Sequence, residues 1–269
     1  MLLVLDVGNT NTVLGIYDGT VLKHHFRIST NRSATGDELC ELLLSLIERR
    51  GVNPKSIEGS VLASVVPPLN RIVVDALQFA FGNPPVVVGP GTKTGMPILI
   101  DNPVEVGADR IVNAVAAWAR HKQALIVVDF GTGTNLDVVT AKGEYVGGAI
   151  APGLDISMDA LFTRAAKLPR VELKKPPKAI GKNTIHALQS GLLYGYAGLV
   201  DALVERMKAE LSSAPDGSDV KVIATGGLAF LFEGVSRTIQ SFDEMLTLDG
   251  LRLIWELNAA HTTPSASRK

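Results

Sequence analysis

The chain has 269 residues, 46% of them hydrophobic and 20% charged, so it can bury a sizeable core in one large domain or two modest ones. Its net charge of -1 gives no electrostatic reason to expect a nucleic-acid or anionic-membrane partner, and its single cysteine, Cys40, excludes an intramolecular disulfide. No apolar run reaches the ~20 residues of a membrane span and Met1 leads directly into a strand-like segment, so we expect a cytoplasmic protein.

The first half is predicted to form a strand meander followed by alternating helices and strands. Three strands come first, separated by short turns such as Asp18-Gly19, and they cover residues 2–6, 12–17 and 21–28. After Thr35 the pattern predicts a helix to residue 50 that contains Cys40 in its apolar run, a strand at 60–66, a helix at 69–81 and a short strand at 85–88. The predicted order is βββαβαβ.

The middle of the chain holds an irregular linker and then an apolar-periodic run. The Gly- and Pro-rich residues 89–97 are either a mobile substrate loop or a plain connection. Asp109 precedes the periodic run at residues 111–118, which predicts a helix that this aspartate caps.

The second half repeats the strand meander. Strands are predicted at residues 124–129, 135–140, 145–150 and 220–224, with helices at 153–166, at 184–211 and from Gly226-Gly227 onward. The basic run 167–178 is either an exposed loop or an anion site, and the polar tail 261–269 is expected to be disordered. We therefore predict an α/β protein with two related domains, 1–118 and 119–269, each a mixed sheet covered by helices.

Two similar loops are the most informative feature of the sequence. Asp6-Val7-Gly8-Asn9-Thr10-Asn11-Thr12 follows the first strand, and Asp129-Phe130-Gly131-Thr132-Gly133-Thr134-Asn135 follows the strand at 124–129. Small residues in such a turn let backbone N–H groups and hydroxyls approach phosphate oxygens, and a carboxylate at each strand end suits a bound metal ion. The pair of loops indicates a duplicated nucleotide site and phosphoryl transfer.

Other nucleotide and catalytic signatures are absent from the sequence. Gly181-Lys182 is followed by Asn183 and lacks the upstream glycine of a P-loop. Leu136 stands where the third glycine of a dinucleotide-binding turn would pack, and a strand follows it instead of a helix. The five histidines are scattered and are expected to be structural or surface residues.

Five short motifs in order resemble the type III pantothenate kinases. They are residues 6–12, Gly107-Ala108-Asp109-Arg110, residues 129–132, residues 148–153 and residues 181–184, and the similarity continues through 224–228 and 246–258. The resemblance implies two ribonuclease-H-like domains in an actin-like ATPase fold, from the superfamily of acetate kinases, sugar kinases and Hsp70. It also implies a homodimer that phosphorylates pantothenate to 4'-phosphopantothenate with ATP, in the first step of coenzyme A biosynthesis, and that needs K⁺ or ammonium.

The resemblance also assigns roles to residues of the two loops. ATP would contact Asp6, Val7, Gly8, Asn9, Thr10, Asn11, Thr12, Val13 and Thr132. Asp6 is the candidate for Mg²⁺, partly through water, and its alternative is an Asx turn. Asp129 matches the ligand of the monovalent cation, and its alternative is a second carboxylate for Mg²⁺.

The remaining assignments concern the substrate. Gly107, Ala108, Asp109, Arg110 and Thr184 match the substrate-binding positions. Asp109 is the candidate general base, and we expect the helix N-terminus to favour its charged form and make it a weak base. Arg110 pairs either with the substrate carboxylate or with a structural acid, and Thr184 either contacts substrate or caps a helix.

Three positions depart from the family pattern, and a second function stays open. Gly133 and Asn135 replace an alanine and a threonine in the second loop, and Ile100 replaces a substrate-contacting tyrosine. The alternative function is that of an ATP-binding accessory factor in regulation. The two strand-end acids together with Asp109 favour a kinase, because a binding module needs no base.

Overall fold

The computed structural model describes residues 1–165, 168–212 and 220–259. The chain divides into two compact units, of which the first contains Met1–Gly95, Asn102–Ala116 and the chain from Thr247, and the second contains Met96–Asp101 and Ala117–Leu246. The predicted boundary at 118/119 lies near the division after Ala116, but the C-terminal helix groups with the first unit. Each unit is described by itself below, and the predicted tail at 261–269 lies outside the described residues.

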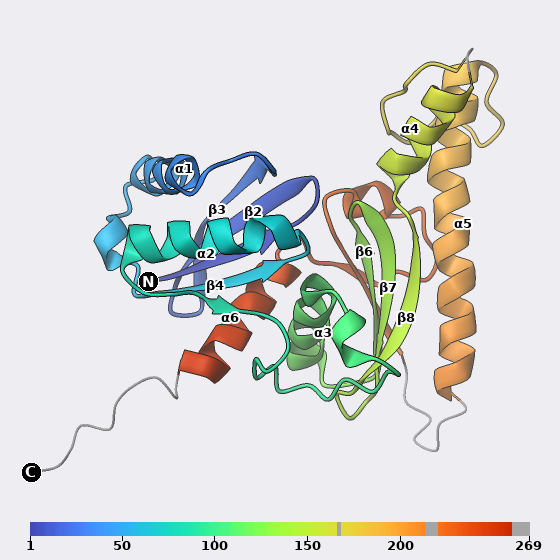
Figure 1. Ribbon diagram of the computed structural model, residues 1–269. Coiled ribbons are helices and arrows are strands. Elements are labelled where there is room, and N and C mark those ends of the chain that lie inside the picture. Colours follow the sequence, from blue (N-terminus) through green and yellow to red (C-terminus); the bar gives the residue numbers. More distant parts are fainter. Residues whose placement is uncertain (166–167, 213–219, 260–269) are drawn as a thin grey trace, which may run out of the picture. The chain divides into compact units, whose positions relative to one another are not determined.

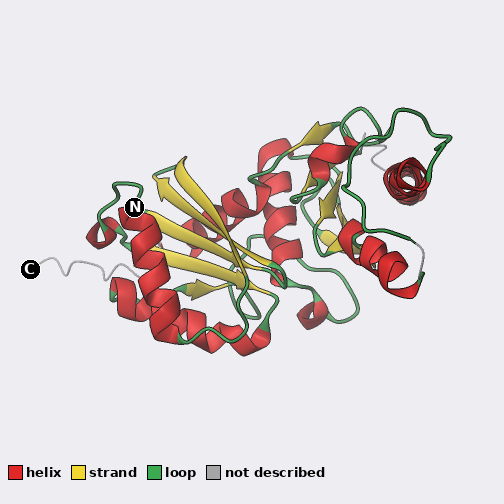
Figure 2. Ribbon diagram, turned by 90° about the horizontal axis from the view of Figure 1, so that it is seen from above, coloured by secondary structure: helices red, strands yellow, loops and turns green. Residues whose placement is uncertain are grey.

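The first unit contains a five-stranded mixed sheet of order β3-β2-β1-β4-β5 (Figures 1 and 2). The strands are β1 (Leu2–Val7), β2 (Asn11–Asp18), β3 (Val21–Ser29), β4 (Gly59–Ser64) and β5 (Val86–Val87). β1, β2 and β3 pair antiparallel, as tight hairpin turns require, whereas β4 and β5 join in parallel after helical crossovers.

Two helices cover one face of this sheet, α1 (Gly36–Glu48) and α2 (Pro67–Phe81) (Figure 1). Thr35 and Glu38 form a reciprocal capping box that starts α1, and two prolines start α2. The alternate β1 residues Leu3, Leu5 and Val7 pack into the core under these helices. Cys40 is buried in α1, as predicted, and the order βββαβαβ is confirmed.

The second unit repeats this sheet, with order β10-β9-β6-β7-β8. Its strands are β6 (Leu125–Phe130), β7 (Gly133–Val139), β8 (Tyr145–Pro152), β9 (Lys221–Thr225) and β10 (Ser241–Phe242). β6, β7 and β8 are antiparallel, and β9 and β10 join in parallel. The pairing directions match those of the first sheet strand for strand, which confirms the duplication that the two loops suggested.

Helices α4 (Leu154–Arg164) and α5 (Thr184–Ser212) follow β8. α5 packs on the face of β6 that carries Ile126, Val128 and Phe130. The α-helix predicted from Gly226-Gly227 is wrong: the segment forms only a short 3-10 helix, η3 (Ala229–Phe232), because Gly226 has a left-handed φ of 94° that interrupts helical geometry. Short 3-10 turns η1 (Pro54–Ser56) and η2 (Pro103–Glu105) also occur.

Helix α3 (Ala108–His121) carries the chain from the first unit to the second, and α6 (Leu246–Ala259) returns it to the first. α6 covers the other face of the first sheet. The Tyr17 hydroxyl donates to Asp249 at 2.7 Å, and Gly59 leaves room for the indole of Trp255. Sequence order suggested that α6 belongs to the second domain. These contacts explain why it belongs to the first unit instead.

None of the described helices is long and apolar enough to cross a membrane.

A buried carboxylate on α5 fixes the turn between η3 and β10. Asp201 is 3% exposed and accepts hydrogen bonds from the backbone of Arg237 and Thr238 and from the hydroxyls of Ser236 and Thr238. Burial raises the pKa of this carboxyl, but the hydrogen bonds outweigh burial and hold its pKa below the ordinary value of 3.8.

Asp201→Asn is therefore expected to destabilise the protein by about 3 kcal/mol at neutral pH, because it removes the charge from several buried hydrogen bonds. The folded pKa lies below the unfolded one, so this stabilisation is present above the unfolded pKa and is lost as pH falls through the folded value. Denaturant midpoints of wild type and variant should converge below about pH 4. Glu205→Gln on the exposed side of the same helix is the control, and an equal loss there would contradict the expectation.

Candidate active site

The first loop, residues 8–11, joins β1 to β2 between the paired residues Val7 and Thr12. Gly8 N donates to Asn11 O at 3.0 Å and closes the turn. Asn9 and Thr10 at its tip are exposed, whereas Thr12 is only 7% exposed. The tip therefore offers amides and a hydroxyl to a ligand, while Thr12 anchors the base of the loop.

The segment between β3 and α1, residues 30–35 (the β3–α1 loop), holds the first loop by three hydrogen bonds. Thr30 N donates to Thr10 O at 2.9 Å, and the Thr30 hydroxyl donates to Gly8 O at 2.7 Å. Arg32 Nη2 donates to Asn9 Oδ1 at 2.7 Å, which places an exposed guanidinium beside the loop tip.

Neither Thr30 nor Arg32 was predicted from the sequence. The signal that identifies them is the β2–β3 register, which pairs Thr12 with Ile28 and brings the end of β3 next to the loop.

Asp6 lies on the face of β1 opposite the α1–α2 core, since Leu5 and Val7 point into that core and side chains alternate along a strand. That opposite face is the one that α6 covers, where Leu248 approaches Gly15 of β2. α6 in turn contacts α3, because the Thr247 hydroxyl donates to Asn113 Oδ1 at 2.7 Å. The Asp6 carboxylate thus faces the side of the first sheet on which α3 begins.

Asp109 lies inside the first turn of α3, one residue after the helix begins at Ala108. It therefore does not occupy the N-cap position, although its Oδ1 accepts the backbone N–H of Arg110 at 2.8 Å. Its carboxyl is half-buried, and burial raises its pKa above 3.8 despite the Arg110 amide and charge, which act in the opposite direction. We expected the helix N-terminus to favour the charged form of Asp109, but burial raises the pKa of this carboxyl instead.

Gly107 makes room for the Asp109 carboxylate. A Cβ at position 107 would lie 2.5 Å from Asp109 Oδ1 and 3.6 Å from Val65 Cγ1. Val65 follows β4, and its N–H donates to Val7 O at 3.1 Å, at the start of the first loop. Val65 therefore lies between the turn at residues 107–110 and the start of the first loop, and all three belong to the first unit.

The second loop, residues 131–133, lies between the paired residues Phe130 and Thr134 and is one residue shorter than the first. Thr132 is exposed at its tip, and its carbonyl accepts Gly153 N at 3.1 Å. A Cβ added at Gly133 would make only an ordinary contact, 3.5 Å from Ala151 O, so the alanine of the family pattern would fit there.

Asp129 occupies the place in β6 that Asp6 occupies in β1, opposite the face that packs on α5. A Cβ at Gly226 would lie 2.5 Å from Asp129 Oδ1, and Gly226 also needs its left-handed φ of 94°. The turn after β9 thereby brings backbone directly against this carboxylate.

Thr184 is the first residue of α5, and it is not the cap. Asn183 caps the helix instead, since its Oδ1 accepts His186 N at 2.8 Å. Thr184 lines an open groove of about 310 Å³ between α4 and α5 together with Leu161 and Leu188. Neither Thr132 nor Asp129 lines that groove.

Within the described ranges, no three His, Cys, Asp or Glu side chains are grouped so that they could hold a metal ion. A divalent ion at Asp6 would therefore take most of its ligands from water and from phosphate oxygens. Mg²⁺ fits this donor set, because it keeps much of its hydration shell and binds through one or two carboxylates plus phosphates.

Comparison with known proteins decides the family. The family model of type III pantothenate kinases matches residues 2–206. A type III pantothenate kinase of Anaeromyxobacter sp. (strain K) is 55% identical over 258 residues, which are 96% of this chain and 100% of the relative. The chain belongs to the type III pantothenate kinase family.

Solved structures agree with membership of the type III pantothenate kinase family at the level of fold. A Campylobacter jejuni protein named as a Baf family transcriptional activator has a TM-score of 0.59 at 18% identity, with 96% of this chain and 99% of that chain covered. A ROK family glucokinase from Streptomyces griseus has a TM-score of 0.52 at 11% identity, with 95% and 98% covered. With the duplicated sheets, these similarities establish two ribonuclease-H-like domains in an actin-like ATPase fold.

Proposed function

We propose that this chain phosphorylates pantothenate to 4'-phosphopantothenate with ATP, in the first step of coenzyme A biosynthesis, and that Asp109 is the general base. The placement of Asp109 carries the proposal: it is half-buried, of raised pKa, and linked through Gly107 and Val65 to the first loop. A carboxylate there accepts the proton of the pantothenate hydroxyl as that oxygen attacks the γ-phosphorus.

The first loop is the proposed cradle for the ATP phosphates. Gly8, Asn9, Thr10 and Asn11 present amides and polar side chains, and Asp6 holds Mg²⁺ partly through water. Mg²⁺, when bound, neutralises charge on the β- and γ-phosphate oxygens. The Thr30 hydrogen is used by Gly8 O, so the Thr12 hydroxyl donates to Thr30, and we propose that Thr12 supports the loop from its base.

In the second unit, Thr132 is the proposed phosphate contact and Asp129 the proposed ligand of K⁺ or ammonium. The position of Asp129 at the end of β6, which matches that of Asp6 in β1, supports the latter, because a cation there would offset negative charge from the phosphates. The alternative, a second acid for Mg²⁺, predicts activity without monovalent cation. Ala108, Arg110 and Thr184 are proposed to contact pantothenate.

Arg32 is proposed to add positive charge beside the phosphates, since its bond to Asn9 uses one of its five donors and holds the rest near the loop tip. Arg32→Gln is expected to lower kcat/KM for ATP roughly 10- to 100-fold, the range for a lost charged hydrogen bond. Steady-state kinetics with varied ATP measure this. Arg27→Gln on exposed β3 is the matched control, and equal kinetics of the two variants would refute the role.

A cytoplasmic homodimer is the proposed state. α5 buries Leu193, Val200 and Val204, whereas its opposite side exposes Gly191, Gly195, Gly198 and Ala202, which let another helix approach closely. Ile156, Leu161 and Phe162 on α4 are also exposed, and Leu161 lines the groove between α4 and α5 together with Gly191. We propose that this side of α5 contributes to the dimer interface.

The decisive test is mass spectrometry of the purified protein incubated with pantothenate, ATP, Mg²⁺ and K⁺. We expect 4'-phosphopantothenate, and its absence from well-folded protein would refute the kinase assignment. Assays with acetate and with glucose as acceptors test whether this chain instead has the activity of other kinases with this fold. An accessory regulatory role is favoured by no feature of the described residues, because the similarity to the Campylobacter jejuni protein is one of fold.

A further inference from the structure

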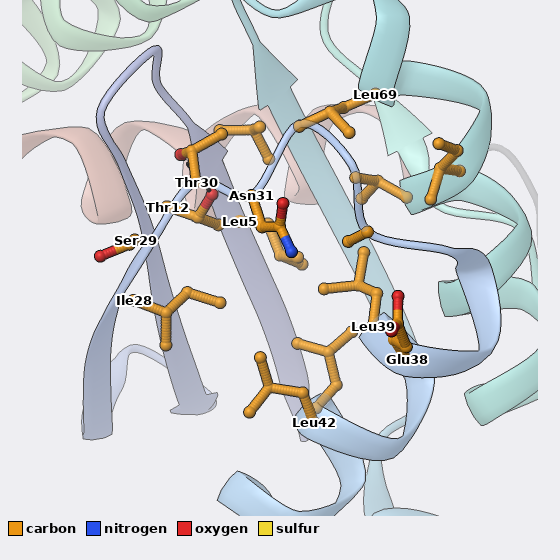
Figure 3. Close-up of a pocket in the computed structure, with 15 residues that line it drawn as sticks. Leu5, Thr12, Ile28, Ser29, Thr30, Asn31, Glu38, Leu39, Leu42 and Leu69 are labelled. Atoms are coloured by element: carbon orange, nitrogen blue, oxygen red, sulfur yellow. Dashed lines mark hydrogen bonds between the residues drawn. The ribbon is translucent and has the colours of Figure 1, made fainter.

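A cavity of about 260 Å³ lies in the first unit, between the sheet and helices α1 and α2 (Figure 3). Its walls are mostly aliphatic and include Leu5 of β1, Ile28 of β3, Leu39 and Leu42 of α1, and Leu69 of α2. Protein interiors hold few voids larger than a water molecule, and an apolar cavity of about 150 Å³ suffices for benzene. By that measure, this cavity has room for a molecule of about ten non-hydrogen atoms.

Three exposed polar residues line the cavity at its margin, Ser29, Asn31 and Glu38, and the Ser29 side chain points away from the leucines of α1 (Figure 3). Asn31 Oδ1 accepts the N–H of Ser33 at 3.0 Å, which fixes the amide, and its nitrogen points toward the aliphatic side chains of α1 (Figure 3). Glu38 Oε2 accepts both the N–H and the hydroxyl of Thr35, which leaves Oε1 as an acceptor. The margin thus presents one N–H donor and one carboxylate acceptor.

These groups define the chemistry of an occupant. A carbonyl or hydroxyl oxygen satisfies the Asn31 amide, and an N–H or O–H satisfies Glu38. The carboxylate of Glu38 disfavours anions, and the aliphatic walls favour a branched hydrocarbon body. The hydroxyls of Thr12 and Thr30 are already hydrogen-bonded to each other and to Gly8 O, so they do not require a charged group on the occupant.

The cavity and the first loop share the β3–α1 loop as a common wall. Thr30 and Asn31 line the cavity, and Thr30 also bonds to the first loop at Gly8 and Thr10. An occupant that holds Asn31 therefore holds the segment that fixes the phosphate-binding backbone. Pre-ordering a binding loop lowers the entropy that a second ligand must lose, which makes the two bindings cooperative.

We propose that this cavity is a binding site for a small neutral amide or alcohol with a branched aliphatic body, and that its occupation tightens ATP binding. The link to ATP rests on the proposed role of the first loop. The site is separate from Gly107–Arg110, none of which lines the cavity.

The test uses isovaleramide as probe and its charged isostere isovalerate as control, with methyl-labelled full-length protein followed by NMR. Isovaleramide is expected to give saturable shifts of the Leu39, Ile72 and Val73 methyls, and isovalerate to give none. Leu42→Phe fills the cavity and should weaken binding about tenfold or more. Leu257→Phe, at a similarly exposed leucine of α6, should leave binding unchanged.

Coupling is measured by repeating the titration with a non-hydrolysable ATP analogue and Mg²⁺. The Kd of isovaleramide should fall about fivefold, and by linkage the Kd of the analogue should fall by the same factor when isovaleramide is present. Absent saturable shifts, or shifts that Leu42→Phe leaves unchanged, would overturn the site, and equal Kd values would overturn the coupling. Neither readout needs turnover, so a failed kinase assay would leave this test intact.

Discussion

Asp109→Asn is expected to lower kcat/KM for pantothenate by ~10²- to 10⁴-fold, the usual contribution of a positioned general base. Asparagine keeps the shape and the acceptor for the Arg110 N–H but cannot take a proton. Steady-state kinetics with varied pantothenate measure the loss. Glu105→Gln changes an exposed acid just before α3 and should retain wild-type activity. A comparable loss in that variant would contradict a specific role for Asp109, because it would show that removing any negative charge near the helix lowers activity.

The pH dependence of the same variant gives a second test. Because burial raises the folded pKa of Asp109, kcat/KM of the wild type should fall as pH drops through that raised pKa, and the limb should vanish in Asp109→Asn. A raised folded pKa contributes stability below the unfolded pKa that is lost as pH rises through the folded value. The neutral variant should thus unfold at a temperature equal to or above that of wild type at pH 7. A lower unfolding temperature of the variant would contradict the conclusion that burying the charged Asp109 carboxylate costs stability.

Gly107→Ala is expected to reduce kcat/KM by ~10²-fold without unfolding the protein. The added methyl would meet Asp109 Oδ1 at 2.5 Å, and a side-chain end turns away more easily than backbone does. The base is then misplaced while the fold persists, which thermal denaturation and kcat/KM together report.

The double variant Gly107→Ala with Asp109→Asn sharpens this result. If the glycine acts through Asp109, the double variant should be no slower than Asp109→Asn alone, because both changes remove the same function. Additive losses would mean that Gly107 serves the substrate directly. Gly89→Ala is the control, since a Cβ there meets nothing within 4 Å.

The sequence predicted β1 to β9 and α1 to α5 because their apolar residues follow clean periods, and it predicted the two loops because turn residues recur at both strand ends. It did not predict the two-residue strand β10 or the helix α6. It missed Thr30 and Arg32, whose neighbours are set by strand register and not by position in the chain. The sequence also predicted the wrong direction for the pKa shift of Asp109, because a helix terminus can be recognised in a sequence and the burial of a side chain cannot. The 3-10 turn after Gly226 depends on a φ that a Gly-Gly pair permits but does not require.

The return of α6 to the first sheet has a consequence for biosynthesis. Tyr17 and Asp249 are separated by 232 positions, so a ribosome must add all the residues between them before this contact can form. The second unit is contiguous apart from a short segment and can fold earlier, whereas one face of the first sheet stays uncovered until α6 has been made. Chains released early would carry an intact second unit and an exposed first sheet, which is the surface that chaperones and proteases recognise.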